Sequence, residues 1–335
     1  MKYVSLLCAV FSFLIVIVFT PLLIRYLRKI GLMVKDMNKE NTPLVPLSGG
    51  IAVAAGTLGG LMLFIFLRKF ILTNGSSIIL DLENSMILFA SMFSIFLVTF
   101  IGFVDDLFIR RDKESSAGLK QWQKPLLTLA GAVPLMIIGA GTTVMTLPIF
   151  GRVDIGILYP LLFIPIGFVI ASNMVNLLAG FNGMETGLGI VSLTSLGLFA
   201  YVYGDKLASL IALMVVASLI GFYLFNKCPA KILPGDSLTY MIGATIAVMA
   251  IVGNIERAAI IVSIPFVAEF LLKLRGRFKV DSYGYYLNGK VKSKYEKIYS
   301  LPHIFTRTGR FTEKQVTFFI IAIEIVFSGL IWLIR

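Results

Sequence analysis

The chain has 335 residues, of which 58% are hydrophobic and 14% are charged, and its formal net charge is +12. This composition excludes a soluble globular protein and is typical of a polytopic membrane protein, in which about 20 consecutive apolar residues cross the bilayer as a helix. The apolar runs also lack the short alternating pattern of a membrane β-barrel, so the predicted fold class is all-α.

Ten apolar segments follow one another along the chain and predict one integral-membrane domain over residues 1–335. The first segment is too long for a signal peptide and has no small-residue cleavage site before Pro21, so we expect it to be retained. The fourth, eighth and ninth are short, which favours tilted or broken helices. The predicted spans are 4–24, 47–67, 85–104, 125–141, 155–172, 187–203, 207–225, 238–253, 258–272 and 315–334.

The lysines and arginines are distributed unevenly among the predicted loops. Most of the 30 fall in the odd-numbered loops, counted from the N-terminus. The positive-inside rule places those loops in the cytoplasm and both termini outside. The net positive charge therefore reflects topology and an anionic substrate, and we expect no nucleic-acid partner.

A pair of carboxylates, Asp105 and Asp106, stands where the third apolar segment ends. An ionisable residue at membrane depth costs about 2.5–3.5 kcal/mol on insertion scales and is a functional candidate, although an exposed helix end is the alternative interpretation. Lys124 would lie near the same surface, and carboxylates beside cations suit a divalent metal or a proton transfer. The pair is followed by the cations Arg110, Arg111 and Lys113.

Asparagines form a second polar cluster after the fifth apolar segment. Asn173 and Asn176 are three residues apart and share a helical face, and Asn182 follows a glycine at which a helix can end. Helix capping explains any one of these amides, but amide oxygens are also good ligands for hard cations.

Three more segments lie on the same predicted side of the membrane. The stretch from Asp36 to Lys39 is a candidate part of a site on this face, and a basic connecting loop is the alternative interpretation. Asp236 stands where the eighth span begins, so it is either a helix cap or part of a phosphate site at a helix N-terminus. Arg275 and Arg277 follow the ninth span and could hold phosphate oxygens in two-point fashion, whereas for Lys290–Lys297 we prefer lipid binding or solvation.

Carboxylates, amides and cations on one membrane face predict a site for Mg²⁺ and a polyphosphate beside the bilayer. The only histidine, His303, has no recognisable catalytic partners, and the chain contains no P-loop. A secondary transporter of an anionic solute is the competing class, but transporter sites lie near the bilayer midplane between repeats, and these residues gather at one face.

Three motifs in this order resemble a known family over almost the whole chain: Gly102-Phe-Val-Asp-Asp106, Asn173-Met-Val-Asn-Leu-Leu-Ala-Gly-Phe-Asn-Gly-Met-Glu185 and Pro234-Gly-Asp-Ser237. The family is that of the polyprenyl-phosphate N-acetylhexosamine-1-phosphate transferases, ten-helix membrane enzymes with a cytoplasmic active site. Within this family, the sequence of the segment Asp36-Met-Asn-Lys39 is most similar to that of the dolichyl-phosphate GlcNAc-1-phosphotransferases of eukaryotes and archaea.

The resemblance implies roles for individual residues. Asn176 and Asp236 would bind Mg²⁺, with Mn²⁺ as a substitute, on the pyrophosphate. Asp105 and Asp106 would act near the lipid phosphate, with Asp105 the candidate for proton handling, and Lys124 would contact phosphate. The remaining implied substrate-binding residues are Asp36, Asn38, Lys39, Asn173, Gly180, Asn182, Gly183, Glu185, Arg275 and Arg277. Relatives often have a histidine at the position of Gly276, so sugar recognition through that position is not expected here.

The implied reaction transfers GlcNAc-1-phosphate from UDP-GlcNAc to a polyprenyl phosphate such as dolichyl phosphate, releasing UMP, in the first step of lipid-linked oligosaccharide assembly for N-glycosylation. Another UDP-HexNAc, or undecaprenyl phosphate in the initiation of a cell-wall or surface polysaccharide, is the alternative within the same class. The compact loops favour an archaeal or other prokaryotic plasma membrane over the endoplasmic reticulum. The sequence leaves the oligomeric state open, with a homodimer among the options.

Overall fold

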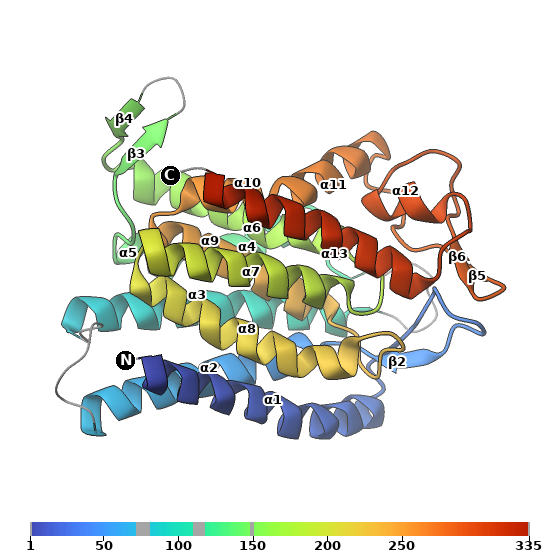
Figure 1. The fold of residues 1–335 in the computed structure, drawn as a ribbon, viewed down its shortest axis with the longest axis horizontal. Coiled ribbons are helices and arrows are strands. Elements are labelled where there is room, and N and C mark those ends of the chain that lie inside the picture. The colour runs from blue at the N-terminus through green and yellow to red at the C-terminus, as the bar shows by residue number, and fades with distance from the viewer. Residues whose placement is uncertain (1, 72–80, 110–117, 148–150, 334–335) are drawn as a thin grey trace.

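A bundle of long apolar helices forms the body of the molecule in the computed structural model, which describes residues 2–71, 81–109, 118–147 and 151–333 (Figure 1). Within these residues, eight helices are long and apolar enough to cross a membrane. This confirms a mostly helical, polytopic membrane protein. The eight are α1 (Lys2–Ile30), α2 (Gly50–Phe66) with its extension η1 (Leu67–Ile71), α3 (Leu82–Leu107), α6 (Ile164–Leu177) preceded by η3 (Tyr159–Phe163), α7 (Met184–Tyr203), α8 (Lys206–Asn226), α9 (Gly235–Gly253) and α13 (Glu313–Leu330), which continues as η4 (Ile331–Leu333).

Two of the ten predicted spans are broken instead of continuous. Segment 125–141 is divided into α4 (Gln123–Thr128), the turn η2 (Leu129–Ala132) and α5 (Val133–Ile137). Segment 258–272 is divided at Ser263 into α10 (Glu256–Val262) and α11 (Ile264–Arg275), and Pro265 follows the break. Proline lacks a backbone N–H and favours the first turn of a new helix, which explains the position of that break. The total of ten crossings therefore stays a prediction.

Helix α9 is the centre of the bundle, and 89% of its hydrophobic window is buried, against 33–61% in the other seven spans. Glycines allow its neighbours to approach closely. A Cβ atom on Gly102 of α3 would collide with the backbone carbonyl of Asp236, and one on Gly243 of α9 would collide with the carbonyl of Ala171 on α6. The N-terminus of α9 is thus held against the end of α3, where the sequence places Asp105 and Asp106.

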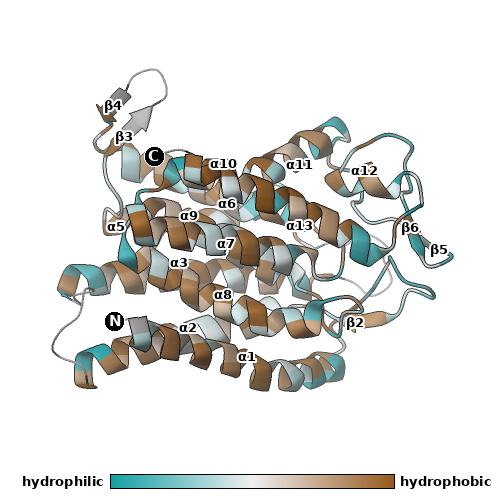
Figure 2. Ribbon diagram, viewed as in Figure 1, coloured by the Kyte–Doolittle hydropathy of each residue, from teal (hydrophilic) through white to brown (hydrophobic). Residues whose placement is uncertain are grey.

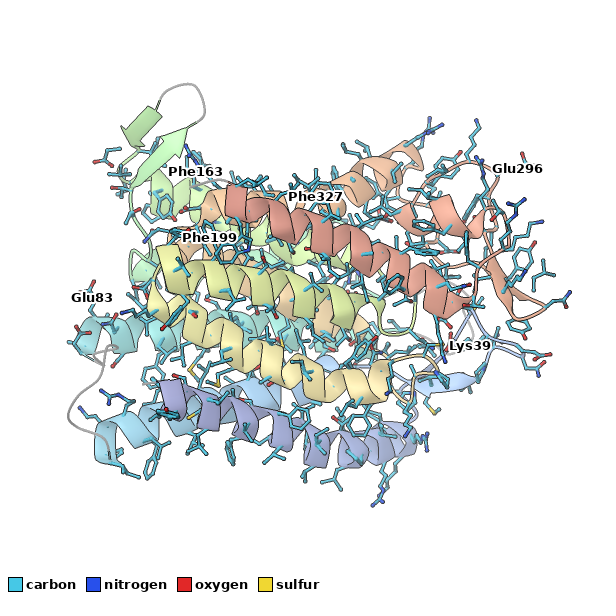
Figure 3. The ribbon with its side chains drawn as sticks, in the orientation of Figure 1. Lys39, Glu83, Phe163, Phe199, Glu296 and Phe327 are labelled. Atoms are coloured by element: carbon cyan, nitrogen blue, oxygen red, sulfur yellow. The ribbon has the colours of Figure 1, made fainter. Side chains whose placement is uncertain are left out.

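The polar residues gather at one end of the bundle, which we call the polar end and define by residues 33–46 and 276–312 (Figure 2). It carries the hairpin β1 (Met33–Lys35) and β2 (Leu44–Pro46), the hairpin β5 (Tyr285–Leu287) and β6 (Lys290–Lys292), and α12 (Leu301–Thr306). Lys39 and Glu296 lie there, whereas Glu83 and Phe163 lie at the opposite end (Figure 3).

Both described ends of the chain lie opposite the polar end, and the C-terminal one lies near the hairpin formed by β3 (Val144–Leu147) and β4 (Gly151–Asp154) (Figure 1). The expected membrane topology, with both termini outside, stays a prediction. The assignment of the polar end to the cytoplasm still rests on the charge distribution.

Candidate active site

A cavity of about 210 Å³ lies at the polar end of the bundle. Its walls come from the segment containing β1, the turn between α6 and α7, and the N-terminus of α9. Apolar groups, including Leu47, Leu233 and Tyr283, form part of the lining. The predicted site residues that line the cavity are Asp36, Asp106, Gly180, Asn182, Glu185 and Asp236.

Asp106, at the end of α3, holds the first turn of α9 in place. Its Oδ1 accepts a hydrogen bond from the backbone N–H of Asp236 at 2.8 Å, and its Oδ2 accepts from the Ser48 hydroxyl at 2.6 Å and from the N–H of Ser237 at 3.3 Å. These N–H groups have no partner within their own helix, so Asp106 caps α9 from another helix. The cap explains Gly235, whose φ of +71° and lack of a side chain make room for the Asp106 carboxylate.

Asp105, one residue earlier, faces a different partner. Its Oδ2 lies 2.7 Å from Nζ of Lys124, and the same ammonium lies 2.8 Å from Oδ2 of Asp236. The backbone N–H of Leu119 and the hydroxyl of Tyr240 also donate to Asp105, at 2.6 and 3.3 Å. A lysine ammonium thus bridges two carboxylates from α3 and α9.

The bridge keeps Lys124 charged. Burial alone would lower the pKa of the Lys124 ammonium, but the carboxylates of Asp236 and Asp105 outweigh this effect and raise the pKa. The site therefore holds a charged ammonium between the carboxylates of Asp105 and Asp236.

The oxygen atoms around Asp236 fit a Mg²⁺ ion that is shared with phosphate. Asn176 on α6 is within hydrogen-bonding reach of Asp236, and its Nδ2 donates to the hydroxyl of Thr239 at 3.1 Å, which leaves its amide oxygen for a ligand. Mg²⁺ is commonly bound through one or two carboxylates together with waters and substrate phosphates. No group of three or more His, Cys, Asp or Glu side chains suited to a metal occurs among the described residues.

The segment from Asp36 to Lys39 forms a second wall of the site. Asp36 accepts a hydrogen bond from the side-chain amide of Asn182 at 2.8 Å. Asn38 donates to the carbonyl of Gly180 at 2.6 Å and accepts from the N–H of Gly284 at 3.1 Å, so it joins three cytoplasmic segments of the predicted topology. These contacts explain why polar residues in this connecting segment are buried.

The turn between α6 and α7 has a backbone that favours glycine. Gly180 and Gly183 have φ values of +122° and +80°. Glu185 accepts a hydrogen bond from the N–H of Gly180 at 2.7 Å, and its second carboxylate oxygen, Oε2, is buried without a hydrogen-bond partner among the residues that the structure describes. The turn therefore contributes Gly180 and Glu185 to the lining of the cavity.

Other predicted residues lie outside the cavity lining. Asn173 donates to the Thr128 hydroxyl at 2.9 Å and so joins α6 to α4. Arg275, the last residue of α11, and Arg277, just after the helix, are exposed, and the Arg275 guanidinium lies 5.8 Å from the centre of the Tyr299 ring. The structure therefore does not bring these three residues to the cavity lining. The cations at 110, 111 and 113 lie outside the described residues.

Sequence reasoning missed Ser48, Tyr240 and Glu313, each of which contacts a predicted site residue. Ser48 has a φ of +83° and is followed by two glycines. A serine next to two glycines is typical of a turn, and this pattern was the signal that the sequence offered. Tyr240 is one helical turn after Asp236, so helical spacing could have found it. Glu313 resembles an ordinary acidic residue in the first turn of a helix, which hides its long-range contact.

Known proteins are similar to this chain along most of its length. The model of the family described as "Glycosyl transferase family 4" matches residues 88–254, which include both aspartate motifs. A protein of Saccharolobus solfataricus named "Putative UDP-N-acetylglucosamine--dolichyl-phosphate N-acetylglucosaminephosphotransferase" is 35% identical over 95% of this chain and 92% of its own length. A protein of the same name in Sulfolobus acidocaldarius is 30% identical over 96% and 94%.

A bacterial relative is similar over a shorter range. The phospho-N-acetylmuramoyl-pentapeptide-transferase of Latilactobacillus sakei is 30% identical over 77% of this chain and 78% of its own length. The archaeal relatives thus match along nearly the full chain, and the bacterial one over about three quarters of it. The chain belongs to glycosyl transferase family 4 and, within it, to the membrane phosphoglycosyltransferases that use polyprenyl phosphates.

Proposed function

We propose that this protein transfers GlcNAc-1-phosphate from UDP-GlcNAc to dolichyl phosphate or a similar polyprenyl phosphate. A phosphate oxygen of the lipid forms a bond to the β-phosphorus of UDP-GlcNAc. The bond from that phosphorus to the bridging oxygen breaks, and UMP leaves with the electron pair. The product is GlcNAc-diphospho-lipid, the starting compound for a lipid-linked oligosaccharide.

The observation that carries the proposal is the ion bridge from Asp105 through Lys124 to Asp236, next to the cavity at the polar end. A phosphate monoester has a second pKa near 6 and is already an anion at neutral pH, so the acceptor needs alignment and charge neutralisation more than deprotonation. Lys124 supplies a fixed charge for phosphate oxygens, and Asp105 and Asp236 hold its ammonium in place.

Asp236 and Asn176 are the residues that would hold Mg²⁺, or Mn²⁺ in its place, and the bound ion would neutralise the pyrophosphate. The wall formed by Asp36, Asn38 and Asn182, with the Gly180–Gly183 turn, would bind the nucleoside. Asp106 would act indirectly, because its hydrogen bonds place the α9 N-terminus. Arg275 and Arg277 remain candidates for contacts to the sugar or pyrophosphate from outside the cavity lining.

The names of the two archaeal relatives support UDP-GlcNAc as donor and dolichyl phosphate as acceptor. The bacterial relative is named for a different sugar substrate, phospho-N-acetylmuramoyl-pentapeptide, so another UDP-HexNAc with an undecaprenyl acceptor is the second candidate. The position of the cavity at one end of the bundle favours either transferase over a transporter with a midplane site. We also propose a prokaryotic plasma membrane, with the site on its cytoplasmic face.

The test is a transfer assay with purified protein, radiolabelled UDP-GlcNAc, polyprenyl phosphate and Mg²⁺. We expect a lipid-linked product whose formation stops with EDTA, and a screen of UDP-sugars with mass spectrometry of the product identifies the donor. The absence of an EDTA-sensitive lipid product from every UDP-HexNAc would disprove the proposal. Asp236→Ala is expected to remain folded and to lose activity.

A further inference from the structure

Glu313 begins the last long helix, 131 residues after Asn182 in the sequence, yet its side chain lies against the wall of the cavity. Its Oε1 accepts a hydrogen bond from the backbone N–H of Asn182 at 2.9 Å, and its Oε2 forms an ion pair with the Lys39 ammonium. The residue is 5% exposed. The Glu313 carboxylate is thus buried, and each of its two oxygens has a partner from another segment of the chain.

The N-terminus of α13 does not need Glu313 as its cap. Thr312 accepts a hydrogen bond from the N–H of Gln315 at 3.3 Å, and the Gln315 side chain accepts from the N–H of Thr312 at 2.9 Å. This reciprocal pair is a complete capping box. The Glu313 carboxylate is therefore available for contacts with other segments, and its partners are Asn182 of the cavity lining, Lys39, and the Cys228 thiol, which donates to Oε2 at 3.4 Å.

Asn182 is held from several directions. Besides the contact with Glu313, its carbonyl accepts from the Thr317 hydroxyl at 3.4 Å, and its side-chain nitrogen donates to Asp36 at 2.8 Å. A carboxylate accepts hydrogen bonds and does not donate them, so the side-chain nitrogen must face Asp36. The amide oxygen of Asn182 then remains for a ligand in the cavity that this residue lines.

Lys39 joins the two acidic residues of this arrangement. Its ammonium pairs with Glu313 and lies 3.7 Å from Oδ2 of Asp36. Without Glu313, the N–H of Asn182 would lose its acceptor, and Lys39 would be free to pair with Asp36 alone. The Lys39 ammonium and the Asn182 side-chain amide would then compete for the same Asp36 carboxylate, and this competition would loosen the orientation of the Asn182 side chain.

We propose that Glu313 is a positioning residue for nucleotide binding: through Asn182 and Lys39, it keeps the Asn182 amide oxygen directed at a hydrogen-bond donor of the nucleotide. This inference rests on the proposed function, because the ligand is the nucleotide part of a UDP-sugar. It assigns the last helix a role in substrate affinity. It does not place Glu313 in contact with the reacting phosphorus.

The experiment compares Glu313→Gln and Glu313→Ala with a matched control, Glu324→Gln. Glu324 is a buried carboxylate on the same helix, three turns further on, and it accepts from its neighbour Ser328 at 3.1 Å away from the cavity lining. Measured quantities are the Kd for UMP by calorimetry, and KM and kcat with UDP-GlcNAc. We expect Glu313→Ala to raise Kd and KM about tenfold, the effect of one hydrogen bond to a charged group, with kcat within about threefold of wild type.

Glu313→Gln has nearly the same shape and keeps one acceptor oxygen, so we expect a smaller rise of Kd and KM than in Glu313→Ala. Glu313→Gln also tests the positioning role of Glu313 in the event that Glu313→Ala does not fold. Glu324→Gln is expected to match wild type in all three quantities. An unchanged Kd for UMP in Glu313→Gln together with unchanged KM would overturn the inference, and so would an equal rise of Kd in Glu324→Gln.

The wild-type protein separates failure of the inference from failure of the proposed function. A wild type that neither binds UMP nor forms the lipid product would overturn both. A wild type that does both, beside Glu313 variants with unaltered Kd and KM, would overturn only the positioning role of Glu313.

Discussion

The backbone N–H of Asp236 donates a 2.8 Å hydrogen bond to Asp106, while the Asp236 side chain pairs with Lys124. The backbone of Asp236 is therefore held in place by Asp106, and its side chain is left to pair with Lys124. The same contacts divide the neighbours Asp105 and Asp106. Asp106 has both oxygens occupied by backbone and hydroxyl donors, and Asp105 shares the lysine that also binds Asp236.

The cap formed by Asp106 predicts a loss of stability on its removal. Asp106→Ala leaves the first N–H groups of α9 and the Ser48 hydroxyl without an acceptor in a buried place, at a cost of about 1–3 kcal/mol. We expect a clear fall in the Tm of the purified protein in detergent, together with lower transferase activity. Ser48→Ala removes only one of the three donors and should lower the Tm less. A wild-type Tm in Asp106→Ala would contradict the capping role.

The lysine bridge predicts a different phenotype. Lys124→Met removes the charge that we assign to phosphate oxygens, so kcat should fall at least about 100-fold, the scale seen when one transition-state donor is lost. It also leaves Asp105 and Asp236 facing each other without a cation, so Mn²⁺ binding to the nucleotide-free protein should tighten, as measured by electron paramagnetic resonance.

Lys120→Met is the matched control for the bridge, since Lys120 is an exposed lysine on the same connecting segment. We expect wild-type kcat and Mn²⁺ affinity in this variant. Equal kcat in Lys124→Met and Lys120→Met would remove Lys124 from the proposed mechanism.

The proposed metal ligands predict a changed requirement for Mg²⁺. Asp236→Asn replaces a charged ligand by a neutral one, so the Mg²⁺ concentration for half-maximal activity should rise at least about tenfold. The control is Asp205→Asn at the N-terminus of α8, where asparagine caps a helix as well as aspartate does. An unaltered Mg²⁺ requirement in Asp236→Asn would place the metal elsewhere.

Much of the fold could be predicted because hydropathy alone determines where long apolar helices lie. The sequence also predicted that Asp36, Asp106, Asn182 and Asp236 belong together, and all four line one cavity. The short fourth and ninth spans were expected to be tilted or broken, and both are broken, whereas the short eighth span is the continuous helix α9. The points at which they break were harder to predict, because apolar composition is the same in a broken and in a continuous helix. Pro134, in the first turn of α5, was the local signal for the break after α4, and Gly139, with a φ of +60°, was the signal for the end of α5.

The division of labour between Asp105 and Asp106 could not be predicted. Adjacent residues on a helix point in different directions, and only the packed positions of α4 and α9 decide which carboxylate meets a lysine and which meets a helix N-terminus. The contacts of Glu313 could not be predicted for a similar reason. Its partners Asn182 and Lys39 are distant in sequence, and pattern reasoning within a window does not join them.

The single histidine predicts a pH dependence of stability in the last connecting segment. His303 is buried in α12, where Nδ1 accepts from the N–H of Tyr299 at 3.3 Å and Nε2 lies 3.0 Å from the carbonyl of Asp281. Only a neutral ring with its proton on Nε2 satisfies both contacts. Burial lowers the pKa of His303 from 6.5 to about 4; the Asp281 carbonyl opposes this shift, and the nearby Lys273 ammonium adds to it.

A lowered pKa in the folded state means that the unfolded chain binds the proton first as the pH falls. The contribution of neutral His303 to stability is therefore complete above about pH 6.5 and is lost as the pH falls toward 4. We expect the Tm of the wild type to fall more steeply between pH 7 and pH 4.5 than that of His303→Gln, in which this group cannot titrate. The measurement is thermal unfolding of both proteins in detergent across that range. Parallel curves would show that His303 does not gain a proton on unfolding, and that its ring is not held neutral between Tyr299 and Asp281.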